Sequence, residues 1–190
     1  MIFNAPNIVT LSRIILIPLL IGLYYLPDDW MSEHTRNVAA TVVFIFAGIT
    51  DWLDGYLARR LNQMSAFGAF LDPVADKLIV AAALVVLLYL KRVDMLVALI
   101  IIGREIAISA LREWMAQVGQ AKSVAVAFIG KLKTVTQMVA IPLLLFHDRL
   151  FGVVDCQWLG TLLINVAAVL TVASMLYYMR KALPHAGARE

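Results

Sequence analysis

The sequence predicts an all-α polytopic membrane protein with six transmembrane helices. Of the 190 residues, 62% are hydrophobic, and the mean hydropathy is +0.85. Both values are far above those of soluble domains. The apolar residues also form six runs that approach or exceed the roughly 20 residues needed to cross a bilayer core. A chain of this length leaves room for one membrane domain, 1–190.

The six runs define the expected helices in order. We expect a short interfacial helix first, because Pro6 and Thr10 suit a helix start. Gly68 and Pro73 are expected to mark the break between the second and third helices. Tyrosines near span ends, Tyr177 and Tyr178 among them, are typical interfacial anchors. The predicted spans run from about Leu11 to Leu26, Val38 to Ala58, Pro73 to Leu90, Met95 to Met115, Val124 to Phe146 and Trp158 to Tyr178.

Positive charge indicates the orientation of these spans. Six spans put both termini on one side of the membrane, and most of the 16 Lys and Arg residues then fall on that same side. The positive-inside rule makes that side cytoplasmic. The net charge of +3 is modest, and no run of Lys and Arg indicates nucleic acid binding.

Four carboxylates stand out between the apolar runs: Asp51, Asp54, Asp72 and Asp76. Spacings of three and four residues put each pair on one helix face. A carboxylate at membrane depth is costly unless it is paired, hydrated or metal-bound, and four such anions side by side would repel one another. Ligation by oxygen alone indicates Mg²⁺ or Mn²⁺. The alternative is that these are helix-end charges facing headgroups and water.

A second charged group lies later in the chain and is cationic. Its members are Arg104, Arg112, Lys131 and Lys133. Arg104 and Arg112 are about two turns apart, on nearly the same helix face. Together the four cations suggest a pocket for an anion beside the carboxylates. They could also be ion pairs that lock helices together, such as Arg104 with Glu105, or charges that set the topology.

The carboxylates also belong to a longer pattern, D-x2-D-G-x2-A-R-x8-G-x3-D-x3-D, which runs from Asp51 to Asp76. This pattern resembles the signature of the class I CDP-alcohol phosphotransferase family. The resemblance implies that Asp51, Asp54 and Asp72 bind metal. It implies further that Asp76 completes the second of two metal sites and acts as the general base.

The same resemblance implies a nucleotide site. The start of the chain carries a P-N-x-x-T-x-x-R pattern at Pro6, Asn7, Thr10 and Arg13, where the family makes nucleotide contacts. Thr10 could instead cap a helix, and Ser65 could cap the turn in which it lies. The residues expected to bind CDP-diacylglycerol are Asn7, Thr10, Asp51, Asp54, Gly55, Arg59 and Ser65.

The block R-E-x6-R-E-W at 104–114 resembles bacterial family members that transfer a phosphatidyl group from CDP-diacylglycerol to sn-glycerol 3-phosphate and release CMP. In them the cations would bind glycerol 3-phosphate. The resemblance implies a bacterial inner-membrane homodimer among membrane lipids, serving phosphatidylglycerol and cardiolipin synthesis. Two alternatives stay open: another acceptor, as in the cardiolipin or inositol-phosphate branches, or a cation-coupled transporter.

Overall fold

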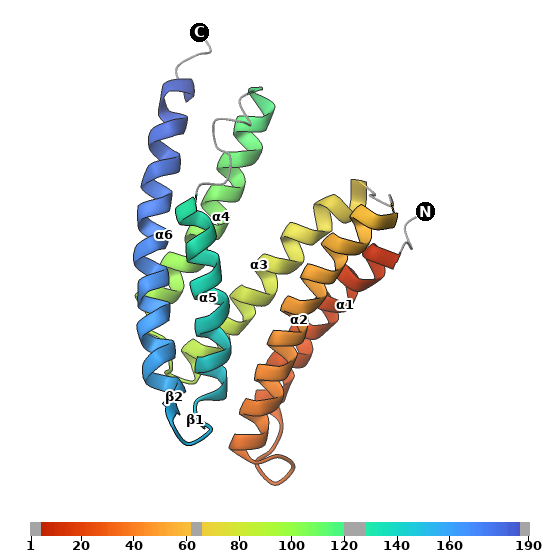
Figure 1. The fold of residues 1–190 in the computed structure, drawn as a ribbon, viewed down its shortest axis with the longest axis vertical. Coiled ribbons are helices and arrows are strands. Elements are labelled where there is room, and N and C mark those ends of the chain that lie inside the picture. Colours follow the sequence, from red (N-terminus) through yellow and green to blue (C-terminus); the bar gives the residue numbers. More distant parts are fainter. Residues whose placement is uncertain (1–4, 62–65, 120–127, 187–190) are drawn as a thin grey trace.

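The computed structural model describes residues 5–61, 66–119 and 128–186, with side-chain placement for 10–51, 68, 70–119 and 129–183 (Figure 1). These residues form an all-α fold, as predicted. A 3-10 turn, Leu23–Tyr25, follows the first helix, and the strands β1 (Arg149–Leu150) and β2 (Val154–Asp155) form a small antiparallel hairpin. The helices are α1 (Ala5–Gly22), α2 (Glu33–Leu61), α3 (Ala66–Tyr89), α4 (Met95–Gln117), α5 (Phe128–Phe146) and α6 (Cys156–Ala186).

Two local expectations are wrong, and the first concerns the start of the chain. Helix α1 runs without a break from Ala5 to Gly22, so the part of the chain that the structure describes has no separate interfacial helix before the first apolar run. Helix α2 begins at Glu33, ahead of the span predicted from about Val38, next to a Ser32 hydroxyl that accepts a hydrogen bond from the Thr35 amide at 3.2 Å. Such a hydroxyl satisfies one of the unpaired amides of a first helical turn.

The break before α3 also differs from the prediction. Gly68 and Pro73 lie inside α3, which already begins at Ala66. Leu71 and Ala75, on either side of Pro73, are both buried. Packing therefore keeps this stretch helical despite the proline, in line with the rule that tertiary contacts override local propensity.

The helices form two groups that meet at one end and separate toward the other (Figure 1). Helix α1 packs on α2 and α3, while α6 packs on α4 and α5, and α2–α5 contacts join the groups. The main hydrophobic core includes Leu20, Phe44, Leu87 and Leu144, one from each of four helices. Helix α1 begins and α6 ends at the opposite end, where the groups diverge (Figure 1).

Arg92 connects the helices at the end of the bundle where the two groups meet. Its side chain is 4% exposed, although it lies in the short connection between α3 and α4. The guanidinium donates to the carbonyl oxygens of Leu144 and Leu145 at 3.3 and 2.9 Å, and to Asn37 Oδ1 at 3.1 Å. The last carbonyls of a helix have no partner within it, so Arg92 satisfies the end of α5 while also holding α2.

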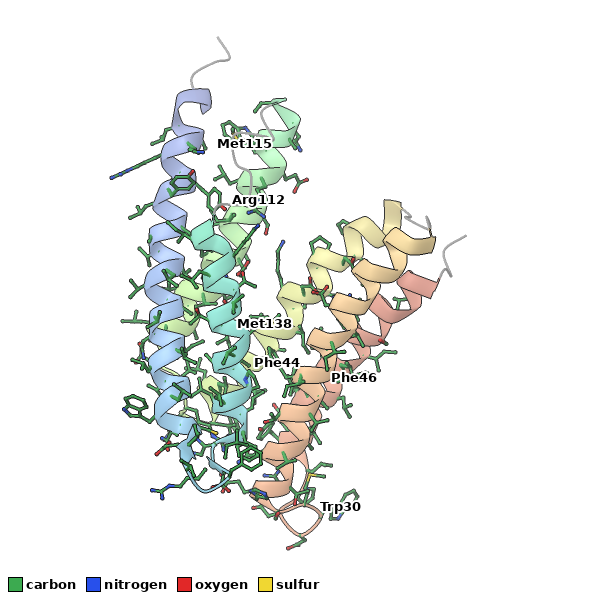
Figure 2. All side chains as sticks on the ribbon, in the orientation of Figure 1. Trp30, Phe44, Phe46, Arg112, Met115 and Met138 are labelled. Atoms are coloured by element: carbon green, nitrogen blue, oxygen red, sulfur yellow. The ribbon has the colours of Figure 1, made fainter. Side chains whose placement is uncertain are left out.

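The outward faces of the helices are apolar. Figure 2 shows this for neighbouring positions of α2: Phe44 points toward the other group of helices and is 3% exposed, whereas Phe46 points away and is 52% exposed. By length and composition, two helical segments among the described residues could cross a membrane, 129–146 and 156–183. Helix α4 carries Arg104 and Arg112, which lower its average hydropathy. The six-span topology is thus not confirmed by composition.

The α5–α6 contact generates a testable prediction at Gly160. A Cβ atom there would lie 2.8 Å from Leu144 Cγ and 3.2 Å from the Leu144 backbone nitrogen. Gly160→Ala should therefore force the two helices apart, and overpacking of this kind costs about 1–3 kcal/mol. We expect a lower Tm in detergent micelles, followed by circular dichroism.

Gly103→Ala is the matched control for this change. It makes the same substitution inside α4, where no atom of a neighbouring helix lies within 4 Å of the added Cβ. Alanine favours a helix over glycine by about 0.5–1 kcal/mol, so the Tm should stay the same or rise slightly. Equal Tm values for the two variants would contradict the tight α5–α6 contact.

Candidate active site

Three of the predicted carboxylates converge from two helices. Asp51 lies on α2, and Asp72 and Asp76 lie four residues apart on α3, facing the same way as their spacing predicts. Their side chains are 43%, 40% and 39% exposed, although the surrounding helix faces are packed. The carboxylates are therefore partly exposed at the surface of these packed helices.

Arg13 binds all three of these carboxylates. Its side chain is fully buried on α1, and it contacts Asp51 Oδ1 and Asp72 Oδ1 at 3.1 Å each. The same guanidinium pairs with Asp76. One turn earlier, the Thr10 hydroxyl donates to Asp72 Oδ1 at 2.9 Å. Three helices thus meet at one ion cluster, and Thr10 belongs to it rather than acting as a helix cap.

Sequence reasoning did not include Arg13 among the site residues. Its signal was present, because Arg13 closes the N-terminal motif and stands inside an apolar run. An arginine in such a run has to find an anion or water, and the four aspartates were the available anions.

Several predicted residues lie outside the part that can be described. Residue Ser65 falls outside the described ranges altogether. For Asn7 in α1, and for Asp54, Gly55 and Arg59 in α2, the structure describes the helix backbone and no side-chain placement. Their expected roles stay predictions.

A cavity of about 450 Å³ opens beside the carboxylates, between the two groups of helices. Asp51 and Asp76 form part of one wall. The opposite wall comes from α4 and α5 and carries Arg104, Arg112 and Lys133. Figure 2 shows Arg112 and Met138, which lie on this second wall. The cavity therefore has an acidic wall, on which Lys77 stands beside the carboxylates, and a cationic wall that faces it.

Glu105 organises part of the cationic wall. Lys133, which is 1% exposed, pairs with Glu105 Oε1, and Arg104 lies 3.6 Å from Glu105 Oε2. Arg104 also donates to the Ser174 hydroxyl of α6 at 3.2 Å. The expected Arg104–Glu105 pair is thus present, and one glutamate serves two cations. The wall keeps an excess of positive charge.

Arg112 has a different environment. Among the described residues no carboxylate lies within ion-pair distance of it, and its guanidinium faces the ring of Tyr178. Tyr178 is fully buried, so the expectation that it anchors at the membrane interface is wrong. Its position inside the helix pair α4–α6, rather than at a span end, explains the difference.

Lys131 is not brought to this cavity. Its side chain is exposed and lies outside the cavity lining, whereas Lys133 is buried within it. Two residues correspond to about 200° around a helix, so these lysines face nearly opposite directions.

The carboxylates offer only oxygen atoms as ligands, and oxygen is the ligand atom that Mg²⁺ and similar divalent cations prefer. Their present spacing is set by the Arg13 guanidinium. Within the ranges with described side chains, no three His, Cys, Asp or Glu residues are grouped closely enough to hold an ion. The positive charge that the cluster requires comes from Arg13 in this arrangement.

Comparison with known proteins places this site in a family. The sequence model described as CDP-alcohol phosphatidyltransferase matches residues 3–177. Proteins from Escherichia coli (strain K12), Salmonella choleraesuis (strain SC-B67) and Shigella flexneri are each 49% identical to the chain over 182 residues, which is 95% of this chain and 95% of theirs. Each is named CDP-diacylglycerol–glycerol-3-phosphate 3-phosphatidyltransferase. The chain belongs to the CDP-alcohol phosphatidyltransferase family.

Proposed function

We propose that this protein transfers the phosphatidyl group of CDP-diacylglycerol to the primary hydroxyl of sn-glycerol 3-phosphate. The products are phosphatidylglycerophosphate and CMP, and the reaction serves anionic phospholipid synthesis. The observation that carries the proposal is the cavity whose acidic wall faces a cationic wall. The names of relatives that match nearly the whole chain support the same reaction.

The acidic wall receives the donor. Asp51, Asp54, Asp72 and Asp76 would hold two Mg²⁺ ions, with Mn²⁺ as the alternative. Bound ions would neutralise the diphosphate and stabilise the departing CMP. The convergence of the three described carboxylates on one cation, Arg13, supports this.

The nucleotide end of the donor lies beside these carboxylates. The Thr10 hydroxyl donates a hydrogen bond to Asp72, which supports a nucleotide position next to the acidic wall. The remaining contacts are assigned by family resemblance, to Asn7, Gly55, Arg59 and Ser65.

Asp76 acts as the general base. It lines the cavity together with Asp51, so its carboxylate can reach a hydroxyl bound there. The hydroxyl gives its proton to Asp76 while its oxygen forms a bond to the phosphatidyl phosphorus. The bond from that phosphorus to the bridging oxygen breaks, and CMP keeps that oxygen.

The cationic wall selects the acceptor. The wall carries three cations and one carboxylate, Glu105, so its net charge is positive. Arg112 has no anionic partner among the described residues. Arginine and lysine suit a phosphate monoester. A neutral or zwitterionic acceptor would leave this charge uncompensated. The wall therefore favours an acceptor that carries its own phosphate.

The chain crosses the bacterial inner membrane six times, as a homodimer, with the cavity and both termini on the cytoplasmic side. Two features support this orientation. Helix α1 begins and α6 ends at the same end of the bundle (Figure 1), and the charged cavity opens where the helix groups diverge toward that end. Water-soluble glycerol 3-phosphate and CMP are then exchanged with the cytoplasm.

An acceptor panel tests the function. Protein in detergent micelles receives CDP-diacylglycerol, Mg²⁺ and one acceptor: glycerol 3-phosphate, phosphatidylglycerol, inositol phosphate or serine. We expect lipid product and CMP, measured by mass spectrometry, with glycerol 3-phosphate alone. Asp76→Asn should lower kcat by about 10²–10⁴-fold, the usual contribution of a general base.

Asp148→Asn is the control, because Asp148 is exposed near the opposite end, beside His34. It should keep full activity. Turnover with a different acceptor would move the protein to another branch of the family, and full turnover in Asp76→Asn would overturn the assignment of the base.

Arg13 provides a test of the cation site that does not depend on turnover. Removing the buried Arg13 leaves three partly exposed carboxylates close together without their shared cation, and solvent screens their repulsion only in part. Arg13→Met should therefore lower the Tm in EDTA. Added Mg²⁺ should raise the Tm of the variant more than that of the wild type, because it replaces the missing positive charge.

Arg149→Met, at an exposed position on β1, should behave like the wild type in both conditions. If Mg²⁺ leaves the Tm of Arg13→Met unchanged, the carboxylates do not hold this ion.

A further inference from the structure

Two arginines of the cavity wall share one aromatic ring. The Arg104 Cζ atom lies 5.9 Å from the centre of the Tyr178 ring, and the Arg112 Cζ atom lies 5.5 Å from it. Both distances are within the roughly 6 Å over which a ring face attracts a cation. The arginines lie two turns apart on α4, and the ring comes from α6.

The ring is fixed in place by its surroundings. Tyr178 is fully buried in a small apolar cluster with Ile108, Met115 and Ala182, which joins α4 to α6. The Tyr177 ring lies against it in a T-shaped arrangement, with 5.6 Å between the ring centres and 74° between the planes. A ring held on several sides has few alternative rotamers, so it can serve as a rigid support.

The two arginines need such a support because their charges repel. Glu105 lies 3.6 Å from Arg104 but is also paired with Lys133. Among the described residues no carboxylate is paired with Arg112, and its guanidinium faces the Tyr178 ring. An uncharged ring can attract both cations without neutralising either one. Their positive charge stays available to an anion in the cavity.

We propose that Tyr178 is a positioning residue for the acceptor's phosphate. Its ring holds Arg104 and Arg112 at the cavity wall so that both guanidinium groups meet one phosphate monoester. Tyr178 is not part of the cavity lining, so it acts through the arginines rather than by touching the substrate. This inference rests on the proposed function, in which those arginines bind glycerol 3-phosphate.

The test separates acceptor binding from donor binding. Tyr178→Leu removes the ring, and the KM for glycerol 3-phosphate should rise by about tenfold as the arginines lose their shared partner. The KM for CDP-diacylglycerol should stay within about twofold, because the donor lies at the other wall. Tyr178→Phe keeps the ring and should restore the KM for glycerol 3-phosphate.

Met179→Ala is the control. Met179 is the next residue of the same helix, its side chain is 48% exposed, and it lies outside both the cavity lining and the apolar cluster around Tyr178. Its loss should leave both KM values close to those of the wild type. A rise in the KM for glycerol 3-phosphate equal to that of Tyr178→Leu would show that α6 packing, and not the ring face, is responsible.

A second series covers the case in which Tyr178→Leu does not fold. Phenylalanines with increasing numbers of ring fluorines at position 178 keep the shape of the side chain and progressively weaken the attraction of the ring face for cations. The KM for glycerol 3-phosphate should rise with each added fluorine, while the Tm stays level. An unchanged KM across this series would overturn the proposal.

These outcomes are distinct from failure of the proposed function. If the wild type does not use glycerol 3-phosphate, the proposed function fails first, and the same series is read on the phosphorylated acceptor that it does use. If the wild type uses glycerol 3-phosphate but Tyr178→Leu raises both KM values equally, the function stands and the role of Tyr178 is structural.

Discussion

The binding of three carboxylates by the buried Arg13 is the constraint on which the rest of the structure depends. Asp51, Asp72 and Asp76 sit too close together to be left without a cation inside a mostly apolar bundle. Arg13 comes from a third helix, so satisfying these charges also fixes α1 against α2 and α3. The first group of helices is organised by an ion cluster as much as by apolar packing.

The second group of helices, α4 to α6, carries the opposite excess of charge. Here the excess charge is positive, and the protein manages it with one shared glutamate, one serine hydroxyl and one aromatic ring. None of these neutralises the wall completely. The two groups therefore present opposite charges across a cavity of about 450 Å³. A substrate pair in which a cation-bound diphosphate meets a free phosphate matches that distribution.

Much of this could be predicted from the sequence, because it depends on short-range patterns. The i, i+4 spacing of Asp72 and Asp76 fixes a shared face, and the apolar runs locate the helices within several residues. What could not be predicted depends on which helices become neighbours. Arg13 visibly needs an anion or water, but the sequence does not show that α1 brings it to α3, and Tyr178 looks like an ordinary residue of an apolar run until α6 meets α4. The position of Lys131 was predictable in principle, since helical periodicity separates it from Lys133.

The two walls of the cavity become available at different stages of protein synthesis. The carboxylates and Arg13 lie in the first three described helices, but Arg104 and Arg112 depend on Ser174 and Tyr178 of α6, which is synthesised after the other five. A nascent chain that extends only through α3 carries a charged cluster without its facing wall. The cavity is completed only after α6 has been synthesised, so a chain that stops before α6 cannot assemble both walls of the cavity.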